Sequence, residues 1–278
     1  MNCIGADRIS GKNRPGGSAR VRTCIGVGRH RDPQDIFFVT PYLIIALITF
    51  LAGFTQGLSG FGSILLALPL LTIMLDIKTV VPLAALDAFL ATIILLFELR
   101  RHLDWKKILP LVAGSLPGIP IGVFFLKYMN TDAIQLTMGI MLLIYALFGL
   151  LFRPVVWEMK AAGASLAGFG AGCLGGALGA SGPPVIVYTS LQPWTKDVIK
   201  ATLQGFLAAS GLVVILLHAL SGLTTMPVLR YFLVSMPALV VGTILGSFFY
   251  GRIDEKAYRR IILIVLALLG GFLVYEVL

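Results

Sequence analysis

The sequence predicts an all-α, polytopic membrane protein, and three observations carry this prediction. Of the 278 residues, 58% are hydrophobic and only 13% are charged, whereas soluble domains carry about 25% charged residues. The apolar residues form continuous runs long enough to cross a bilayer. These runs do not alternate apolar with polar residues, which argues against a β-barrel. The net charge of +9 is spread over the N-terminal region and short loops, so we expect no nucleic-acid partner.

The chain divides into a polar tail and a series of apolar segments. Residues 1–37 are polar and rich in Gly and Arg, and we expect them to be disordered. The apolar segments follow at about 41–75, 79–99, 108–126, 133–152, 161–192, 198–220, 227–250 and 258–278. We therefore expect about eight transmembrane segments.

Two of these segments are too long for a single straight crossing. Residues 41–75 as one helix would measure roughly 50 Å, against a hydrocarbon core of about 30 Å. Residues 161–192 pose the same problem. Each must tilt strongly, break or turn back on itself, and each contains a Gly-rich stretch where the break is needed.

The two Gly-rich stretches align with each other, and a second pair of stretches aligns later in the chain. The matching pairs are 53–69 with 168–184, and 118–125 with 242–249. The order of the matches is the same in both halves, which predicts two homologous four-segment repeats, 41–152 and 161–278. Whether the repeats are parallel or inverted stays open. Lys and Arg outside the tail are divided almost evenly between the two sides, so only the tail favours a cytoplasmic N-terminus.

A broken helix in each repeat predicts a site for an anion. The second half of a broken helix begins with unpaired N–H groups, where the helix dipole favours negative charge. Close helix packing is the alternative explanation for spaced glycines, and we prefer it for the GxxxG pairs at 118–122 and 242–246. We predict that the substrate-binding residues are Gln56, Gly57, Gly60, Phe61, Gly62, Ser63, Gly175, Gly176, Gly179, Ser181, Gly182, Pro183 and Gln204.

Few ionisable residues lie deep in the apolar segments. Asp87 is near the middle of 79–99 among alanines, and it is either a hydrogen-bonded buried residue or a proton carrier. His218 lies near the end of its segment, and an interfacial position without a coupling role is our interpretation. The sequence contains no HExxH motif, no Cys/His cluster and no P-loop lysine. We therefore predict neither a metal site nor a cofactor.

Two other functional classes were weighed against a carrier. Gly179-Ala180-Ser181-Gly182 resembles the GxSG motif of rhomboid intramembrane proteases, and His218 is the only candidate base. The second GxSG string, at 57–60, is out of register in the duplication, and Pro183 directly after the motif does not fit a helix-starting serine. We therefore predict that the protein is not an enzyme. An anion channel would share the architecture and stays the alternative to a carrier.

Together, the two Gly-rich stretches and the paired GxxxG segments resemble the sulfite-exporter TauE/SafE family of membrane permeases. The resemblance covers about 41–278, and the Arg-rich tail departs from the family. It implies movement of sulfite, sulfoacetate or related organosulfur anions without an ATP-binding subunit. We predict a secondary transporter of the plasma (inner) membrane whose partners are a small anion and the lipid bilayer. We expect alternating access by rocking of one repeat against the other. The sequence leaves a homo-oligomer open.

Overall fold

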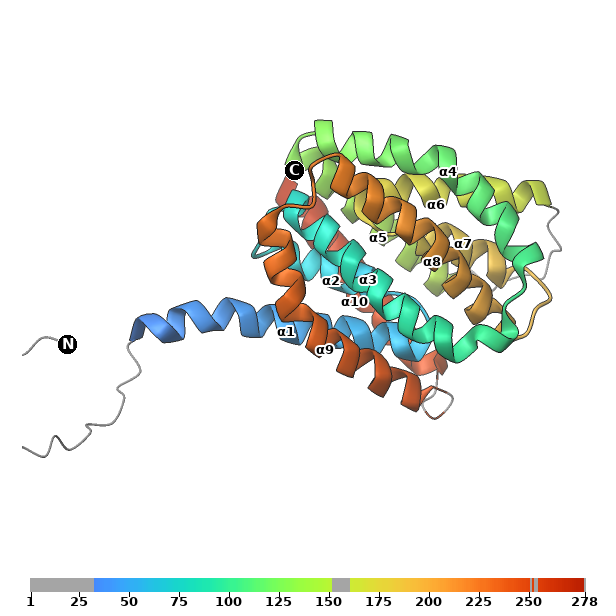
Figure 1. The fold of residues 1–278 in the computed structure, drawn as a ribbon, viewed down its shortest axis with the longest axis horizontal. Helices are drawn as coiled ribbons and strands as arrows, with labels where there is room; N and C mark the ends of the chain where they lie inside the picture. Colours follow the sequence, from blue (N-terminus) through green and yellow to red (C-terminus); the bar gives the residue numbers. More distant parts are fainter. Residues whose placement is uncertain (1–32, 152–160, 251, 253–254, 278) are drawn as a thin grey trace, which may run out of the picture.

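The computed structural model describes residues 33–151, 161–250, 252 and 255–277, so most of the predicted 1–37 tail lies outside it. Every regular element in these ranges is a helix, as predicted. In chain order they are α1 (Pro33–Ser59), α2 (Ser63–Thr72), α3 (Ile77–Leu99), the short 3₁₀ helix η1 (Arg100–His102), α4 (Trp105–Tyr128), α5 (Thr131–Leu151), α6 (Ala161–Leu178), α7 (Gly182–Ser190), α8 (Lys196–Leu220), α9 (Met226–Phe249) and α10 (Glu255–Val277) (Figure 1).

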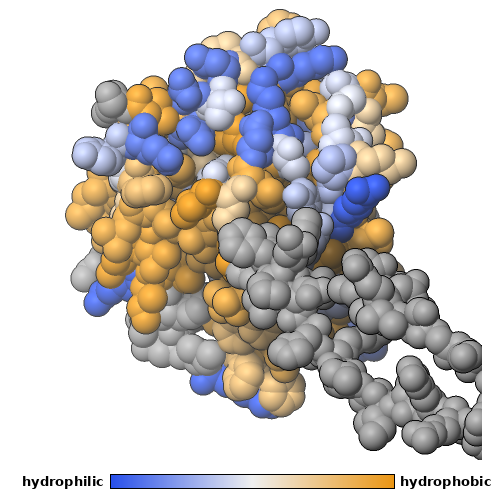
Figure 2. Space-filling model, turned by 90° about the vertical axis from the view of Figure 1, so that its left-hand side faces the viewer, coloured by the Kyte–Doolittle hydropathy of each residue, from blue (hydrophilic) through white to orange (hydrophobic). Residues whose placement is uncertain are grey.

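By length and composition, seven helices in the described part of the chain are able to cross a membrane. This agrees with an integral membrane protein. Figure 2 shows one face of the molecule, where hydrophobic residues form a broad surface and hydrophilic residues gather toward its upper end and lower edge. The number differs from the expected eight because residues 161–192 form two shorter helices, α6 and α7. Gly179, with a φ of 69°, lies between them and is unsuited to a right-handed helix.

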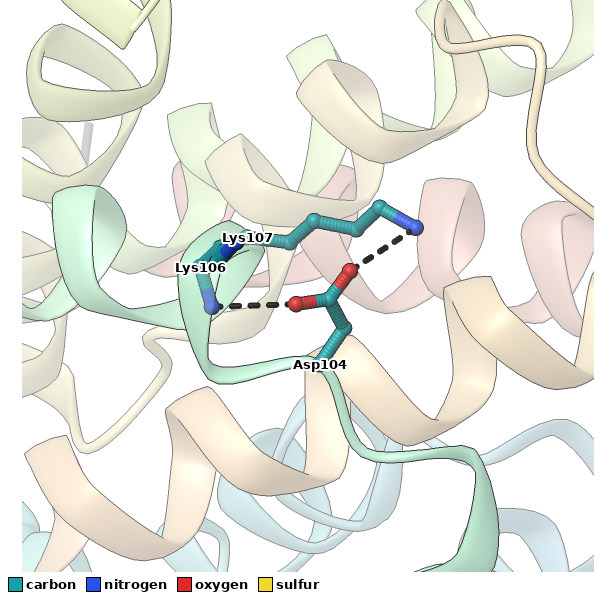
Figure 3. Close-up of polar contacts among 3 residues, drawn as sticks. All are labelled: Asp104, Lys106 and Lys107. Atoms are coloured by element: carbon teal, nitrogen blue, oxygen red, sulfur yellow. Dashed lines mark hydrogen bonds and ion pairs between the residues drawn. The ribbon is translucent and has the colours of Figure 1, made fainter.

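The starts of α3 and α4 are capped by aspartate side chains. Asp104 precedes α4, and its side chain accepts a hydrogen bond from the Lys106 backbone N–H at 3.0 Å. The same carboxylate lies 3.3 Å from the Lys107 ammonium (Figure 3). Asp76 accepts from the Lys78 N–H in the same way at the start of α3. These carboxylates satisfy N–H groups that the first turn of a helix leaves free.

Contacts between helix ends define the two sides of the bundle. At the start of α3, Lys78 Nζ donates to a carbonyl at the end of α4 at 3.4 Å. At the end of α3, Glu98 accepts from Ser247 at the end of α9. The end of α9 also meets the start of α8, where Tyr250 donates to Asp197 at 3.2 Å. We name the side with the start of α3 side A, and the side with the end of α3 side B.

The first helices of the two halves run in opposite directions. The end of α1 lies toward side B, because Lys200 near the start of α8 contacts the Gly57 carbonyl. The short α2 then leads back to the start of α3 on side A. The end of α6 lies toward side A, because His218 near the end of α8 contacts the Gly176 carbonyl. The short α7 leads back to the start of α8 on side B.

Two helix pairs, α1 with α9 and α4 with α6, pack backbone against backbone. A Cβ added at Gly57 would collide with the carbonyl oxygen of Thr243, and one at Gly172 with that of Ser115. Such contact is possible only where the side chain is a hydrogen atom. The GxxxG glycines have the packing role that their spacing predicts: Gly118, Gly122, Gly242 and Gly246. The first helix of each half thus packs against the third long helix of the other half.

Candidate functional site

The chain between α1 and α2 turns within three residues, Gly60 to Gly62. Gly60 and Gly62 have φ angles of 81° and 99°, in the left-handed region that glycine adopts without strain. α1 closes with a hydrogen bond from the Gly60 N–H to the Gln56 carbonyl at 2.7 Å. Ser59 Oγ donates to the Phe61 carbonyl at 2.7 Å, which holds the turn. The N–H groups in the first turn of α2 have no acceptor within that helix.

Gln56 ties this turn to α3. Its Nε2 donates to Thr92 Oγ1 at 3.0 Å and to the Ala88 carbonyl at 3.4 Å. Its Oε1 accepts from the Ser63 hydroxyl, the first residue of α2. The side chain is 1% exposed. One buried amide therefore connects the end of α1, the start of α2 and the middle of α3.

The chain between α6 and α7 turns in a similar way but with different partners. The Gly179 N–H donates to the Gly175 carbonyl at 2.8 Å. Ser181 precedes α7, is 4% exposed, and its hydroxyl makes no hydrogen bond to any described residue. Pro183 and Pro184 follow, and neither has an N–H group. The start of α7 therefore offers the Gly182 N–H and the Ser181 hydroxyl as donors.

The two turns line one cavity of about 50 Å³ in the centre of the bundle. Alanines 85 and 88 with Thr92 on α3, and Leu207, Gly211 and Val214 in the middle of α8, complete its wall. A buried water needs roughly 10–15 Å³ by this kind of measure, so the cavity has room for about three to five non-hydrogen atoms. It is a small site with polar groups at the two turns and apolar walls between them.

The cavity brings together most of the residues predicted to bind substrate. These residues are Gln56, Phe61, Gly62, Ser63, Gly179, Ser181, Gly182 and Pro183. Gly175 lies directly behind this set, because a Cβ there would overlap the Ser181 hydroxyl. Gly57 and Gly176 instead face the backbones of α9 and α4.

Gln204 and Asp87 lie outside the cavity wall. Gln204 Nε2 donates to the Gly60 carbonyl at 2.5 Å, so it holds the outside of the first turn. Asp87 is 3% exposed and faces α9, where Ser235 Oγ donates to its Oδ1 at 2.7 Å. Its Oδ2 has no hydrogen-bond partner among the described residues. The alanines around Asp87 indicated a buried position, but not this partner.

Sequence reasoning missed two contributors to this region. Thr92 carries no signal of its own, because a threonine in an apolar helix is common. Lys200 was counted among the charges at helix ends, yet it is 5% exposed and its Nζ donates to the Gly57 carbonyl at 3.1 Å. His218 is also buried, and one ring nitrogen lies 3.0 Å from the Gly176 carbonyl. The position of His218 in its segment did not indicate this contact with α6, and its interfacial depth stays a prediction.

Comparison with known proteins identifies the family. The family model described as “Sulfite exporter TauE/SafE” matches residues 45–273. The chain belongs to the sulfite exporter TauE/SafE family. A relative from Cupriavidus necator, described as “Probable sulfite/organosulfonate exporter TauE”, is 27% identical over 178 residues, which are 62% of this chain and 69% of the relative. No solved structure matches the chain.

Membership in the TauE/SafE family makes this chain a membrane transporter and not an enzyme, as predicted. The contacts of the two residues in the protease alternative agree with this. His218 Nε2 contacts the Gly176 carbonyl, and Ser181 makes no hydrogen bond to any described residue. A serine protease needs its histidine within hydrogen-bond reach of the serine.

Proposed function

We propose that this TauE/SafE protein is a secondary transporter of the plasma membrane that moves sulfite or a small organosulfonate. The observation that carries the proposal is that the α1–α2 and α6–α7 turns, one from each half, line the same cavity. The name of the Cupriavidus necator relative supports the substrate class. The room for about three to five non-hydrogen atoms suits the four of a sulfite ion.

The chemistry of the cavity favours an anion held without a fixed positive charge in its wall. The starts of α2 and α7 both contribute, and a helix start attracts negative charge through its free N–H groups and dipole. The Ser181 hydroxyl adds a donor that no described residue of the protein uses. Phe61, Phe89 and Ile186 provide apolar wall for the carbon end of an organosulfonate.

The two halves are proposed to be inverted repeats. Two observations support this: α1 and α6 run in opposite directions, and each packs against a helix of the other half. α1 packs against α9, and α6 packs against the equivalent helix α4. These pairs bind the halves together through backbone contacts. Rocking of one repeat against the other would break these contacts. We therefore propose instead that α2, α3, α7 and α8 move while the pairs α1–α9 and α4–α6 stay fixed. The cavity lies among the moving helices, so this motion would open it to each side in turn.

The test is flux of radiolabelled sulfite and of short organosulfonates into proteoliposomes. Gly182→Leu places a side chain beside the cavity and is expected to abolish flux while the protein still inserts and folds. Gly271→Leu is the matched control, because a Cβ at Gly271 meets no atom within 4 Å. Unimpaired flux in Gly182→Leu would remove the cavity from the transport path.

The same proteoliposomes separate a carrier from a channel. A carrier exchanges internal for external substrate and saturates at low rates, whereas a channel shows much larger, unsaturated flux. The small volume of the cavity, about 50 Å³, favours a carrier over an open pore. Acceleration of uptake by substrate loaded inside the vesicle is the expected result.

Asp87 is the proposed proton carrier. Its carboxyl is buried against Ser235, and one oxygen has no partner among the described residues. An ionisable residue at this depth is usually functional. Asp87→Asn is expected to lose accumulation driven by an imposed proton gradient but to keep exchange of substrate for substrate. Gradient-driven accumulation that survives in Asp87→Asn would return Asp87 to a purely structural role.

A further inference from the structure

A buried lysine lies at the end of α1. Lys200 is 5% exposed, whereas Lys196, one turn earlier on α8, is exposed. Burying an ammonium group inside a protein is costly unless protein groups replace its water. The groups that contact the Lys200 ammonium must therefore stabilise its charge, and their chemistry indicates the role of this lysine.

Two partners of Lys200 are groups that attract a cation. Its Nζ donates to the Gly57 carbonyl at 3.1 Å, in the last turn of α1, where the helix dipole is negative. The same Nζ lies 3.6 Å from the centre of the Tyr250 ring, within the range of a cation–π contact. A second α8 side chain, Gln204, binds the Gly60 carbonyl one turn further along.

Gly60 makes room for the lysine. A Cβ at Gly60 would lie 2.8 Å from Lys200 Cγ and 3.2 Å from its Cε. The left-handed φ of Gly60 is needed for the turn, and the missing side chain is needed for the stem of Lys200. Gly60 therefore serves both the turn between α1 and α2 and the packing of the Lys200 stem.

Carbonyl groups at the end of a broken helix are the usual ligands of a coupling Na⁺ in carriers with broken helices. We propose that the Lys200 ammonium is a built-in cation at this position, so that the protein transports its anion without Na⁺. Lys200 then acts as a positioning residue for Gln56, which precedes Gly57 and lines the cavity. This inference rests on the proposed transport function for its purpose, but its main test needs no substrate.

The main test is thermal unfolding of the purified full chain in NaCl, KCl or N-methylglucamine chloride at equal ionic strength. The native Tm is expected to be the same in all three salts. Lys200→Ala leaves the carbonyl groups at the end of α1 without a cation, so the Tm of this variant is expected to fall. Added Na⁺ should then raise its Tm by a few degrees. Lys196→Ala is the matched control and should behave as the native protein.

Either of two results would overturn the proposal: a native Tm that rises specifically with Na⁺, or a Lys200→Ala variant that folds and shows no response to Na⁺ or K⁺.

If Lys200→Ala does not fold, Lys200→Arg and Lys200→Met test the proposal instead. Arg keeps the charge and should keep a native Tm and sulfite flux, whereas Met keeps the stem and should lose both. Equal behaviour of Arg and Met would contradict a role for the charge. Absence of sulfite flux in the native protein would refute the transport function alone, since the Tm experiment is independent of substrate.

Discussion

The two turns that line the cavity each begin with a left-handed glycine, but they differ in how their polar groups are used. At the α1–α2 turn, Gln56 binds Ser63 and Thr92, and α8 holds the outer carbonyls through Lys200 and Gln204. At the α6–α7 turn, the Ser181 hydroxyl has no protein partner among the described residues. Gln56 at the first turn therefore has its polar atoms paired within the protein, whereas the second turn keeps the Ser181 hydroxyl unpaired among the described residues. We infer that the first turn maintains the shape of the site and that the second contributes more to recognition of the anion.

The largest effect on stability is expected for Gln56→Leu. Loss of the amide leaves Ser63 Oγ and Thr92 Oγ1 without their partner, and each buried polar group left unpaired costs about 1–3 kcal/mol. The free energy of unfolding in detergent measures this loss. Gln135→Leu on α5, where the side chain is half-buried, is the control and should change it little. A small effect in Gln56→Leu would show that the first turn does not depend on this amide.

Alanine substitutions at Gly60 and Gly182 should separate the two turns next. Gly60→Ala forces a left-handed residue, at about 1–2 kcal/mol, and also meets Lys200. At Gly182 an added Cβ would lie 3.5 Å from Ile186 Cδ1, an ordinary contact. We expect a clear drop in the unfolding free energy for Gly60→Ala and almost none for Gly182→Ala. Equal drops would mean that the two turns are equally constrained.

Alanine substitutions of Ser63 and Ser181 are expected to change different quantities, stability for the first and sulfite binding for the second, each by about 1 kcal/mol. Ser63→Ala removes a hydrogen bond within the protein and should lower the unfolding free energy. Ser181→Ala removes a donor that we propose binds the anion, and it should weaken sulfite binding about fivefold, with little change in stability. Binding is measured by competition against radiolabelled sulfite. The reverse pattern would assign recognition to the first turn.

The smallest effect is expected for Pro183→Ala, which makes the second turn resemble the first. The substitution restores a backbone N–H at the start of α7, and we expect sulfite to bind about threefold more tightly. Greater freedom of the unfolded chain should lower the unfolding free energy by about 0.4–1 kcal/mol. Pro184→Ala, on the residue that does not line the cavity, is the control for the effect on binding. Weaker binding in Pro183→Ala would show that the proline ring itself shapes the cavity.

Much of the fold follows from length and periodicity in the sequence. The all-helical membrane architecture is confirmed, and seven of the expected spans correspond to long apolar helices. The over-long 161–192 segment pointed to an interruption, and Gly179 lies where α6 ends and α7 begins. The repeat itself stays a prediction, supported by the reciprocal helix pairs.

Parts of the site could not be predicted, because they depend on which helices become neighbours. Spacing alone could not show that Gly57 meets α9 rather than a substrate, since a glycine stripe suits either partner. Lys200 looked like an ordinary charge near a segment end, and only its position beside the Gly57 carbonyl reveals it as buried. The Ser235 contact of Asp87 joins residues far apart in the chain, and no local pattern encodes it.

The close pairing of α1 with α9 also bears on how the protein is made. α9 begins at Met226, so the ribosome has synthesised most of the 278 residues before the glycine face of α1 can meet its partner. Until then α1 is in the bilayer with a bare backbone stripe facing lipid or the translocation machinery. Assembly must therefore wait for the second half, and an isolated N-terminal half is expected to be a target for membrane proteases rather than a working unit.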